Sequence, residues 1–156
     1  QKNIAAESLG SLLPLIKKGL IHLVLVAGVR AEVRSHLVSL IEYYGLTHFL
    51  DRTISIVYES EKIDYFTTFN KVLRTTDVLW TKPSELSFYT GLGIPIIIAP
   101  PLGAQERSNR QWLLENGSGI DQYDPAAAHE WLMDLKESGA LARAALCGFV
   151  VRWKNN

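Results

Sequence analysis

Short apolar runs alternate with helical patterns along this chain, and that alternation limits its fold more than any other feature. The run 20–27 is almost wholly apolar, as in strands that are buried on both faces, and the run 94–99 is the clearest strand of the chain. Such strands are typical of parallel sheets covered by helices. The sequence therefore predicts an α/β fold, a doubly wound parallel sheet with right-handed crossovers and helices on both faces.

The hydrophobic periodicity also predicts where the elements lie. Asp124-Pro125 is a helix start, with Asp as N-cap and Pro at the first helical position, and Asn116-Gly117 closes the helix before it. We find no linker, so residues 1–156 are expected to form a single domain. The predicted strands are 20–27, 53–58, 77–81, 94–99 and 119–122, and the predicted helices are 4–18, 32–45, 62–74, 84–92, 106–115, 124–136 and 141–153.

Composition narrows the class of protein. Hydrophobic residues make up 47% of the 156 residues, which argues against disorder, and the formal net charge of +0 without a basic block argues against a general nucleic-acid binder. A single cysteine, Cys147, indicates a reducing compartment. The most apolar run is too short to span a bilayer. We expect a soluble, cytoplasmic protein; association with the inner membrane surface stays open.

The chain begins with a predicted helix, although a doubly wound fold normally begins with a central strand. We therefore expect a fragment of a longer protein, with a strand and a whole domain upstream of Gln1. A natural helix that flanks the sheet is the alternative.

A first candidate site follows the predicted strand 77–81. Pro83 ends that strand and Ser84 can cap the next helix, whose N-terminus favours an anion such as a diphosphate. Lys82 adds a positive charge, and Glu85 can accept hydrogen bonds from ribose hydroxyls or simply stabilise the helix dipole. Ordinary helix capping explains these residues as well.

A second candidate site follows the predicted strand 94–99. Prolines at 100 and 101 stiffen the loop, and Gly103 permits a tight turn or a close backbone approach. Amide and carboxylate groups then stand at the mouth of the next helix, where they suit a polyol, although a capped helix start explains them equally. The candidates here are Pro101, Gly103, Ala104, Gln105, Glu106 and Asn109. The four histidines lie in different elements without metal-ligand spacing, so we expect no metal and no cofactor.

The two candidate sites belong to one longer pattern. It consists of Lys82-Pro83, Gly93-Ile94-Pro95, Pro100-Pro101, Gln105-Glu106, Asn109 and Glu115-Asn116-Gly117, in this order. The pattern resembles the nucleotide-sugar half of GT-B glycosyltransferases. It is similar in particular to monogalactosyldiacylglycerol synthases, processive diacylglycerol glucosyltransferases and the N-acetylglucosaminyltransferase that completes lipid II.

The resemblance implies a fold and a function. The chain would be the Rossmann-like C-terminal half of a two-domain GT-B enzyme and would bind a nucleotide-diphosphate sugar, with a UDP-sugar favoured. Residues 81–86 would face the nucleotide and its phosphates, and Gln105, Glu106 and Asn109 the sugar and ribose. Transfer would be inverting and independent of metal. The acceptor, a lipid or a glycan, and the general base would belong to the N-terminal domain, so this chain alone would be inactive. Peripheral membrane association of the full-length protein is a further implication.

This sequence departs from the family pattern at two points. Phe88 stands where the family has a ribose-binding glutamate, a role that Glu85 could take over. Ser84-Glu85 replaces a glycine pair after Lys-Pro. Two other functions therefore remain open: a nucleotide-sugar epimerase or hydrolase with the same fold, and a non-catalytic α/β interaction module.

Overall fold

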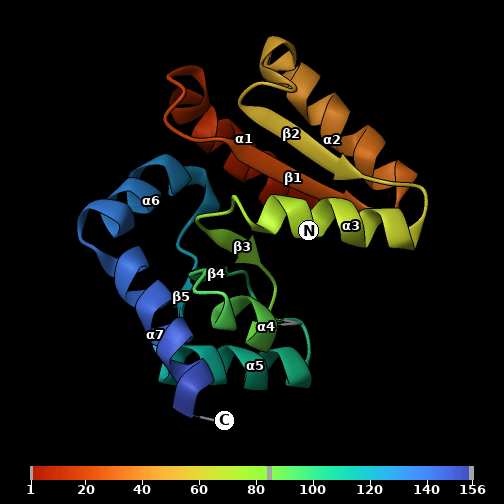
Figure 1. Ribbon diagram of the computed structural model, residues 1–156. Helices are drawn as coiled ribbons and strands as arrows, with labels where there is room; N and C mark the ends of the chain where they lie inside the picture. Colours follow the sequence, from red (N-terminus) through yellow and green to blue (C-terminus); the bar gives the residue numbers. More distant parts are fainter. Residues whose placement is uncertain (1, 84–85, 155–156) are drawn as a thin grey trace. The chain divides into compact units, whose positions relative to one another are not determined.

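The structure, a computed structural model, describes residues 2–83 and 86–154, with side chains described at 5–83 and 88–151 (Figure 1). The contacts divide the chain into two compact units. The first unit is Gln1–Thr75 with Asp124–His129, and the second is Thr76–Tyr123 with Glu130–Asn156. Each unit is described here by itself. The expectation of a single domain, 1–156, stays a prediction.

The described residues form seven α-helices and two small parallel sheets. The α/β class and the parallel pairing of the strands are therefore confirmed. A single doubly wound sheet and a Rossmann-like GT-B half stay predictions. Among the described residues, no helix is both long enough and apolar enough to cross a membrane.

The first unit is built around two parallel strands, β1 (Leu23–Gly28) and β2 (Ile54–Tyr58). Helix α2 (Ala31–Tyr43) connects them and contacts both. Helices α1 (Lys2–Lys17) and α3 (Lys62–Leu73) and the 3₁₀ helix η1 (Thr47–Phe49) complete the elements that precede residue 76. The buried core of this unit includes Leu9, Leu12, Ile16, Ile41, Leu46 and Ile54.

One expectation about burial in this unit is wrong. The apolar run at 20–27 is not buried on both faces, since β1 is mostly half-buried and Val26 is 43% exposed. Helix α3 is open as well: Leu73 is buried, but Ile63 is 80% and Phe66 59% exposed. Both observations have one cause, because a sheet described with only two strands offers too little surface to cover a whole strand face or helix face.

The helix expected to start at Asp124 begins as a separate short element. Asp124 Oδ1 accepts a hydrogen bond of 3.0 Å from the amide of Ala126, which confirms the predicted cap. A 3₁₀ helix, η2 (Pro125–Ala127), follows and contacts α1, and α6 (Ala128–Glu137) comes next. Ser11 in α1 holds the start of α6, since its Oγ accepts from the amide of His129 at 3.1 Å and lies 2.9 Å from Nδ1 of the same residue.

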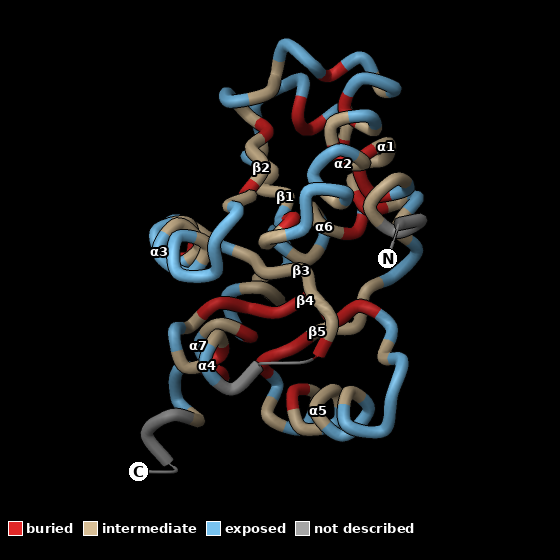
Figure 2. Tube along the Cα trace, turned by 90° about the vertical axis from the view of Figure 1, so that its right-hand side faces the viewer, coloured by how far each residue is buried: buried red, intermediate tan, exposed pale blue. Residues whose placement is uncertain are grey.

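The second unit contains three parallel strands in the order β3 (Leu79–Thr81), β4 (Ile96–Ile98) and β5 (Gly119–Asp121). Helices α4 (Leu86–Gly91) and α5 (Ala104–Glu115) connect them, and α7 (Ala140–Lys154) follows α6 at the end of the chain. Residues 94–99 are buried throughout, and Figure 2 shows this stretch in red. Gly117 has a φ of 70° directly after α5, the left-handed conformation in which glycine ends helices.

The two faces of this sheet are covered by different side chains. Ile96 and Ile98 form a buried cluster with Leu113 of α5, and Tyr89 of α4 packs against it. The register places Trp80, Ile97 and Ile120 on the other face. There Trp80 meets Trp131 of α6 edge to face, with 5.2 Å between the ring centres. Side chains of α4 and α5 thus pack on one face of β3–β4–β5, and Trp131 of α6 packs on Trp80 at the other.

Candidate functional site

The two segments singled out in the sequence lie where β3 and β4 end. Lys82 and Pro83 directly follow β3, and the loop 99–103 leads from β4 into α5. Since β3 and β4 are parallel, these loops open at the same edge of the sheet. The carboxyl edge of a parallel sheet is where α/β proteins bind ligands.

A hydrogen bond joins the two segments. Asn109 in α5 donates from Nδ2 to the carbonyl oxygen of the buried Pro83 at 2.9 Å. Gln105, one turn earlier, donates from Nε2 to Oδ1 of Asn109 at 3.1 Å. Three of the candidate residues therefore form one chain of contacts that runs from the start of α5 to the loop after β3.

Glu106 has a local role at the start of α5. Its Oε2 accepts a hydrogen bond of 2.7 Å from the amide of Leu102, the residue before the N-cap Gly103. A carboxylate near the third helical position that reaches back to a free amide is a capping interaction. For Oε2 of Glu106, helix capping is therefore a sufficient explanation.

The conformation of Gly103 corrects one expectation. Its φ of −121° is extended backbone that any residue adopts, so a tight turn does not require glycine here. A Cβ built on Gly103 would meet nothing within 4 Å. The space beside the N-terminus of α5 is open, and Ala104 and Gln105 in the first turn are exposed, while Pro101 is half-buried.

The anion site predicted at Ser84 and Glu85 lies outside the described residues. Helix α4 is described from Leu86. Phe88 stands at the position where the resemblance implies a glutamate, and it is 60% exposed. Its ring packs edge to face with the ring of Tyr89, with 5.7 Å between the ring centres.

An ion pair that the sequence did not indicate lies at the same edge of the sheet. Arg110 of α5 donates from Nε to Oδ1 of Asp121 at 2.7 Å and from Nη2 to Oδ2, and Asp121 is the last residue of β5. The hydrogen bond to the carboxylate raises the pKa of Arg110 further above its ordinary value. The sequence does contain a signal for this pair: Asp121 lies at a strand end, and Arg110 lies on the helix that precedes that strand.

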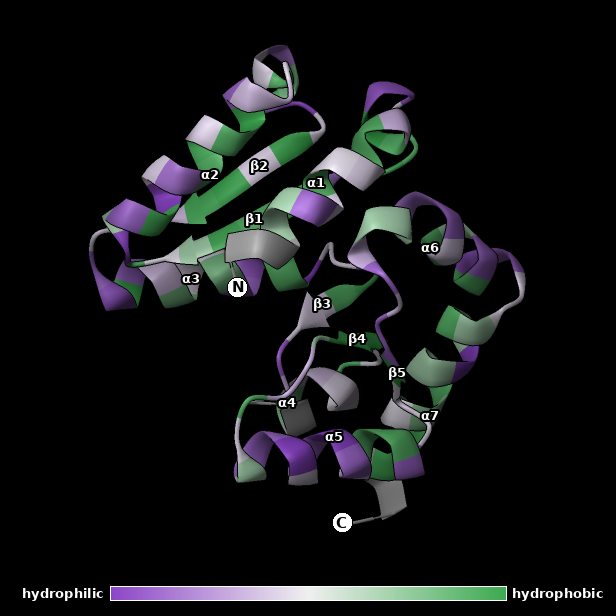
Figure 3. Cartoon of the chain, turned by 180° about the vertical axis from the view of Figure 1, so that it is seen from behind, coloured by the Kyte–Doolittle hydropathy of each residue, from purple (hydrophilic) through white to green (hydrophobic). Residues whose placement is uncertain are grey.

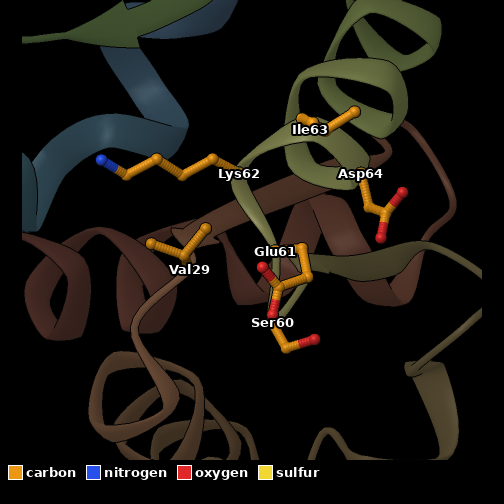
Figure 4. A pocket seen from close by; sticks show the side chains of 6 residues that line it. All are labelled: Val29, Ser60, Glu61, Lys62, Ile63 and Asp64. Carbon is orange, nitrogen blue, oxygen red and sulfur yellow. The ribbon is translucent and has the colours of Figure 1, made fainter.

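A hollow in the first unit also escaped the sequence analysis. It has a volume of about 610 Å³ and lies past the ends of β1 and β2, at the start of α3; its lining residues are Val29, Ser60, Glu61, Lys62, Ile63 and Asp64. In Figure 4 the side chains of Lys62 and Asp64 point in opposite directions. Carboxylates at Glu61 and Asp64 are favourable beside the positive end of the α3 dipole. The side chain of Glu61 makes no capping hydrogen bond, so the interaction of these carboxylates with the helix dipole is a sufficient reason for their position.

Groups of three or more potential metal ligands are not found in the described part of the chain. A comparison of this sequence and structure with models of known protein families, with curated proteins and with solved structures finds no match.

Proposed function

We propose that this chain is the donor-binding domain of a glycosyltransferase and binds a nucleotide-diphosphate sugar, with a UDP-sugar favoured. One observation carries the proposal. Asn109 is hydrogen-bonded to the carbonyl of Pro83, and these residues come from the two separate stretches on which the GT-B resemblance rests. Two motif segments that meet at the carboxyl edge of a parallel sheet are suited to hold one ligand between them.

The chemistry of the side chains fits this ligand. Lys82 supplies a positive charge for a diphosphate, at the loop that Asn109 holds. The amide of Gln105 is exposed at the start of α5, where it can bond to sugar hydroxyls. In the proposed reaction the sugar is transferred with inversion and without a metal. Lys82 and the helix N-termini at this edge stabilise the charge that develops on the leaving diphosphate. The acceptor and the general base belong to a separate acceptor-binding domain.

Thermal unfolding in the presence of nucleotides tests the proposal. UDP and UDP-sugars should raise the melting temperature more than GDP, ADP and their sugars. A ligand at a hundred times its Kd stabilises a protein by about 2.7 kcal/mol, which is several degrees for a chain of this size. Equal responses to every nucleotide, or none, would contradict it.

Two glutamines on α5 offer a matched pair of variants. Gln105→Ala removes an amide from the proposed site, whereas Gln111→Ala removes one two turns later, where Gln111 bonds to Glu115 at 2.7 Å. The proposal expects a lower nucleotide affinity for the first variant and an unchanged affinity for the second. If both variants bind UDP as the original chain does, the ligand does not lie beside the start of α5.

A non-catalytic α/β module is the second candidate function. It is favoured by Phe88, which is exposed where a ribose-binding glutamate is expected, and by Glu106, whose Oε2 is already bonded to Leu102. If the chain is such a module, no nucleotide should change its melting temperature. The same thermal measurement therefore separates the two functions.

A further inference from the structure

One edge of β1 has no strand beside it among the described residues, because the sheet of the first unit consists of β1 and β2 alone. The amide of Leu23 donates at 2.8 Å to the carbonyl oxygen of Thr53, directly before β2. Peptide groups of successive residues in a strand point in opposite directions, so those of Val24 and Val26 point to the open edge. An open edge of this kind is a template for pairing with another strand.

The sequence of β1 does not protect this edge. Natural sheets protect open edges with charged residues, prolines or bulges. The strand, Leu-Val-Leu-Val-Ala-Gly, contains no charged residue and no proline, and Figure 3 shows it in shades of green. Its register shift comes only at its end, between Val26 and Gly28. The stretch before that shift is therefore suited to pair with a strand.

Burial decreases from β2 toward the open edge of β1. Ile54 of β2 is fully buried, whereas its partner Leu23 on β1 is half-buried. Val57 of β2 is 4% exposed, whereas its partner Val26 is 43% exposed. The apolar side chains that lack cover thus lie beside the open edge of β1 and not beside the outer edge of β2.

The position of α1 indicates which strand fits this edge. Helix α1 contacts α2, and Figure 2 shows both helices on one side of β1 and β2, with α3 on the other. Connections between parallel strands are right-handed in about 98% of cases. Two right-handed crossovers on the same face of a sheet advance in the same direction. A strand that leads through α1 into β1 therefore lies on the side of β1 opposite β2, which is the open edge.

We infer that the open edge of β1 binds a further strand, which runs parallel to β1 and leads into α1. A strand upstream of Gln1 is expected from the sequence; its edge, its direction and its composition follow only from the structure. Because helices lie on both sides of β1 and β2, the added strand is apolar on both faces. The inference is independent of the proposed sugar-nucleotide site, since no residue of β1 was assigned to that site.

Fusion of a designed strand to the N-terminus of the whole chain tests the inference. The fused segment has about seven valine, isoleucine and threonine residues, joined to Gln1 by about four glycine and serine residues. The matched control is the same segment with proline at alternate strand positions, since proline cannot donate to a ladder. Hydrogen exchange of single backbone amides, measured by NMR, reports on the open edge directly.

The amides on the two sides of β1 should behave differently. In the original chain those of Val24 and Val26 should exchange at least about tenfold faster than that of Leu25, which points to β2. The fused strand should slow the exchange of Val24 and Val26 at least about tenfold and should raise the melting temperature. The segment with prolines should do neither.

Two variants of Val26 make the test specific to this edge. Val26→Pro removes a donor from the open edge and should cancel the protection that the fused strand gives to Val24. Val26→Thr keeps the amide and the branched side chain, so the fused strand should protect Val24 as before. If Val26→Pro does not fold, as judged by circular dichroism, the comparison of the two fused segments still decides the inference.

Three outcomes would overturn the inference. The first is equal exchange of the Val24, Val26 and Leu25 amides in a monomeric original chain, because the edge would then be covered already. The second is an equal effect of the fused strand and the segment with prolines. The third is a dimer of the original chain that Val26→Pro converts to a monomer; the edge would then be an interface between copies of the chain.

Discussion

Asn109 in α5 donates a hydrogen bond of 2.9 Å from Nδ2 to the carbonyl oxygen of Pro83, which follows β3. Pro83 is fully buried, so its carbonyl needs a partner from the protein. The bond holds the loop after β3 against the first turns of α5, and Gln105 orients the Asn109 amide by bonding to its oxygen.

Asn109→Ala should therefore lower the free energy of unfolding by about 1 to 2 kcal/mol, because it leaves the Pro83 carbonyl without this donor. Urea unfolding followed by circular dichroism measures the change. Ser108→Ala is the control, since the Ser108 hydroxyl is exposed and bonds along its own helix, to the carbonyl of Ala104. Equal midpoints for the two variants would mean that the bond to Pro83 contributes little.

Arg110→Lys should destabilise the second unit slightly, by less than about 1 kcal/mol, because lysine cannot make the two-point contact with Asp121 and the pair is partly exposed. The side chains are 35% and 42% exposed. The effect should shrink in high salt, which screens exposed charges. A loss that stays the same at all salt concentrations would point to packing of the arginine stem instead.

The same ion pair makes a prediction about pH. The pKa of Arg110 is raised in the folded chain, so its contribution is complete below the ordinary arginine pKa and is lost only above it. Titration of Arg110 should consequently leave stability unchanged in neutral and mildly alkaline solution. Comparing the original chain with Arg110→Gln across that pH range checks this: the difference between their unfolding free energies should be constant.

Gly148→Ala should destabilise the chain although alanine favours helices. The new methyl group would meet the carbonyl oxygen of Thr90 at 2.8 Å, a backbone atom that cannot move by itself. Overpacking of this kind costs about 1 to 3 kcal/mol, more than the gain in helix propensity of about 1 kcal/mol. Thermal melting measures the result.

Gly10→Ala in α1 is the matched control for that variant. A Cβ built on Gly10 would lie 2.9 Å from the hydroxyl of Tyr44, the end of a side chain that can turn aside. Its melting temperature should fall less than that of Gly148→Ala, and a reversed order would show that α4 and α7 can separate at low cost.

The contact between Trp80 and Gln122 is expected to show an interaction energy of about 1 kcal/mol in a double-mutant cycle with Trp80→Phe and Gln122→Leu. Trp80 donates from Nε1 to Oε1 of Gln122 at 2.9 Å across one face of the second sheet. Strictly additive single effects would mean that water replaces either partner freely.

Much of the fold was predictable because it depends on local periodicity. The runs at 53–58 and 94–99, the cap at Asp124 and the glycine after α5 all follow from residues near one another in the sequence. Burial was harder to predict. Ile63 and Phe66 have the spacing of a core-facing helix, yet they are exposed, because the extent of the sheet beneath α3 is not encoded in α3 itself.

In the candidate site, too, some features follow from the sequence and others only from the tertiary structure. The sequence alone determined which loops follow the parallel strands and which polar residues they carry, since strand ends and helix starts have local signals. Only the tertiary structure decided how those side chains are used. Asn109 bonds to Pro83, 26 residues away in the sequence, Arg110 pairs with Asp121, and Glu106 turns back to its own loop. A hydrogen bond depends on the distance and direction between two atoms, and for distant residues these exist only once the chain has folded.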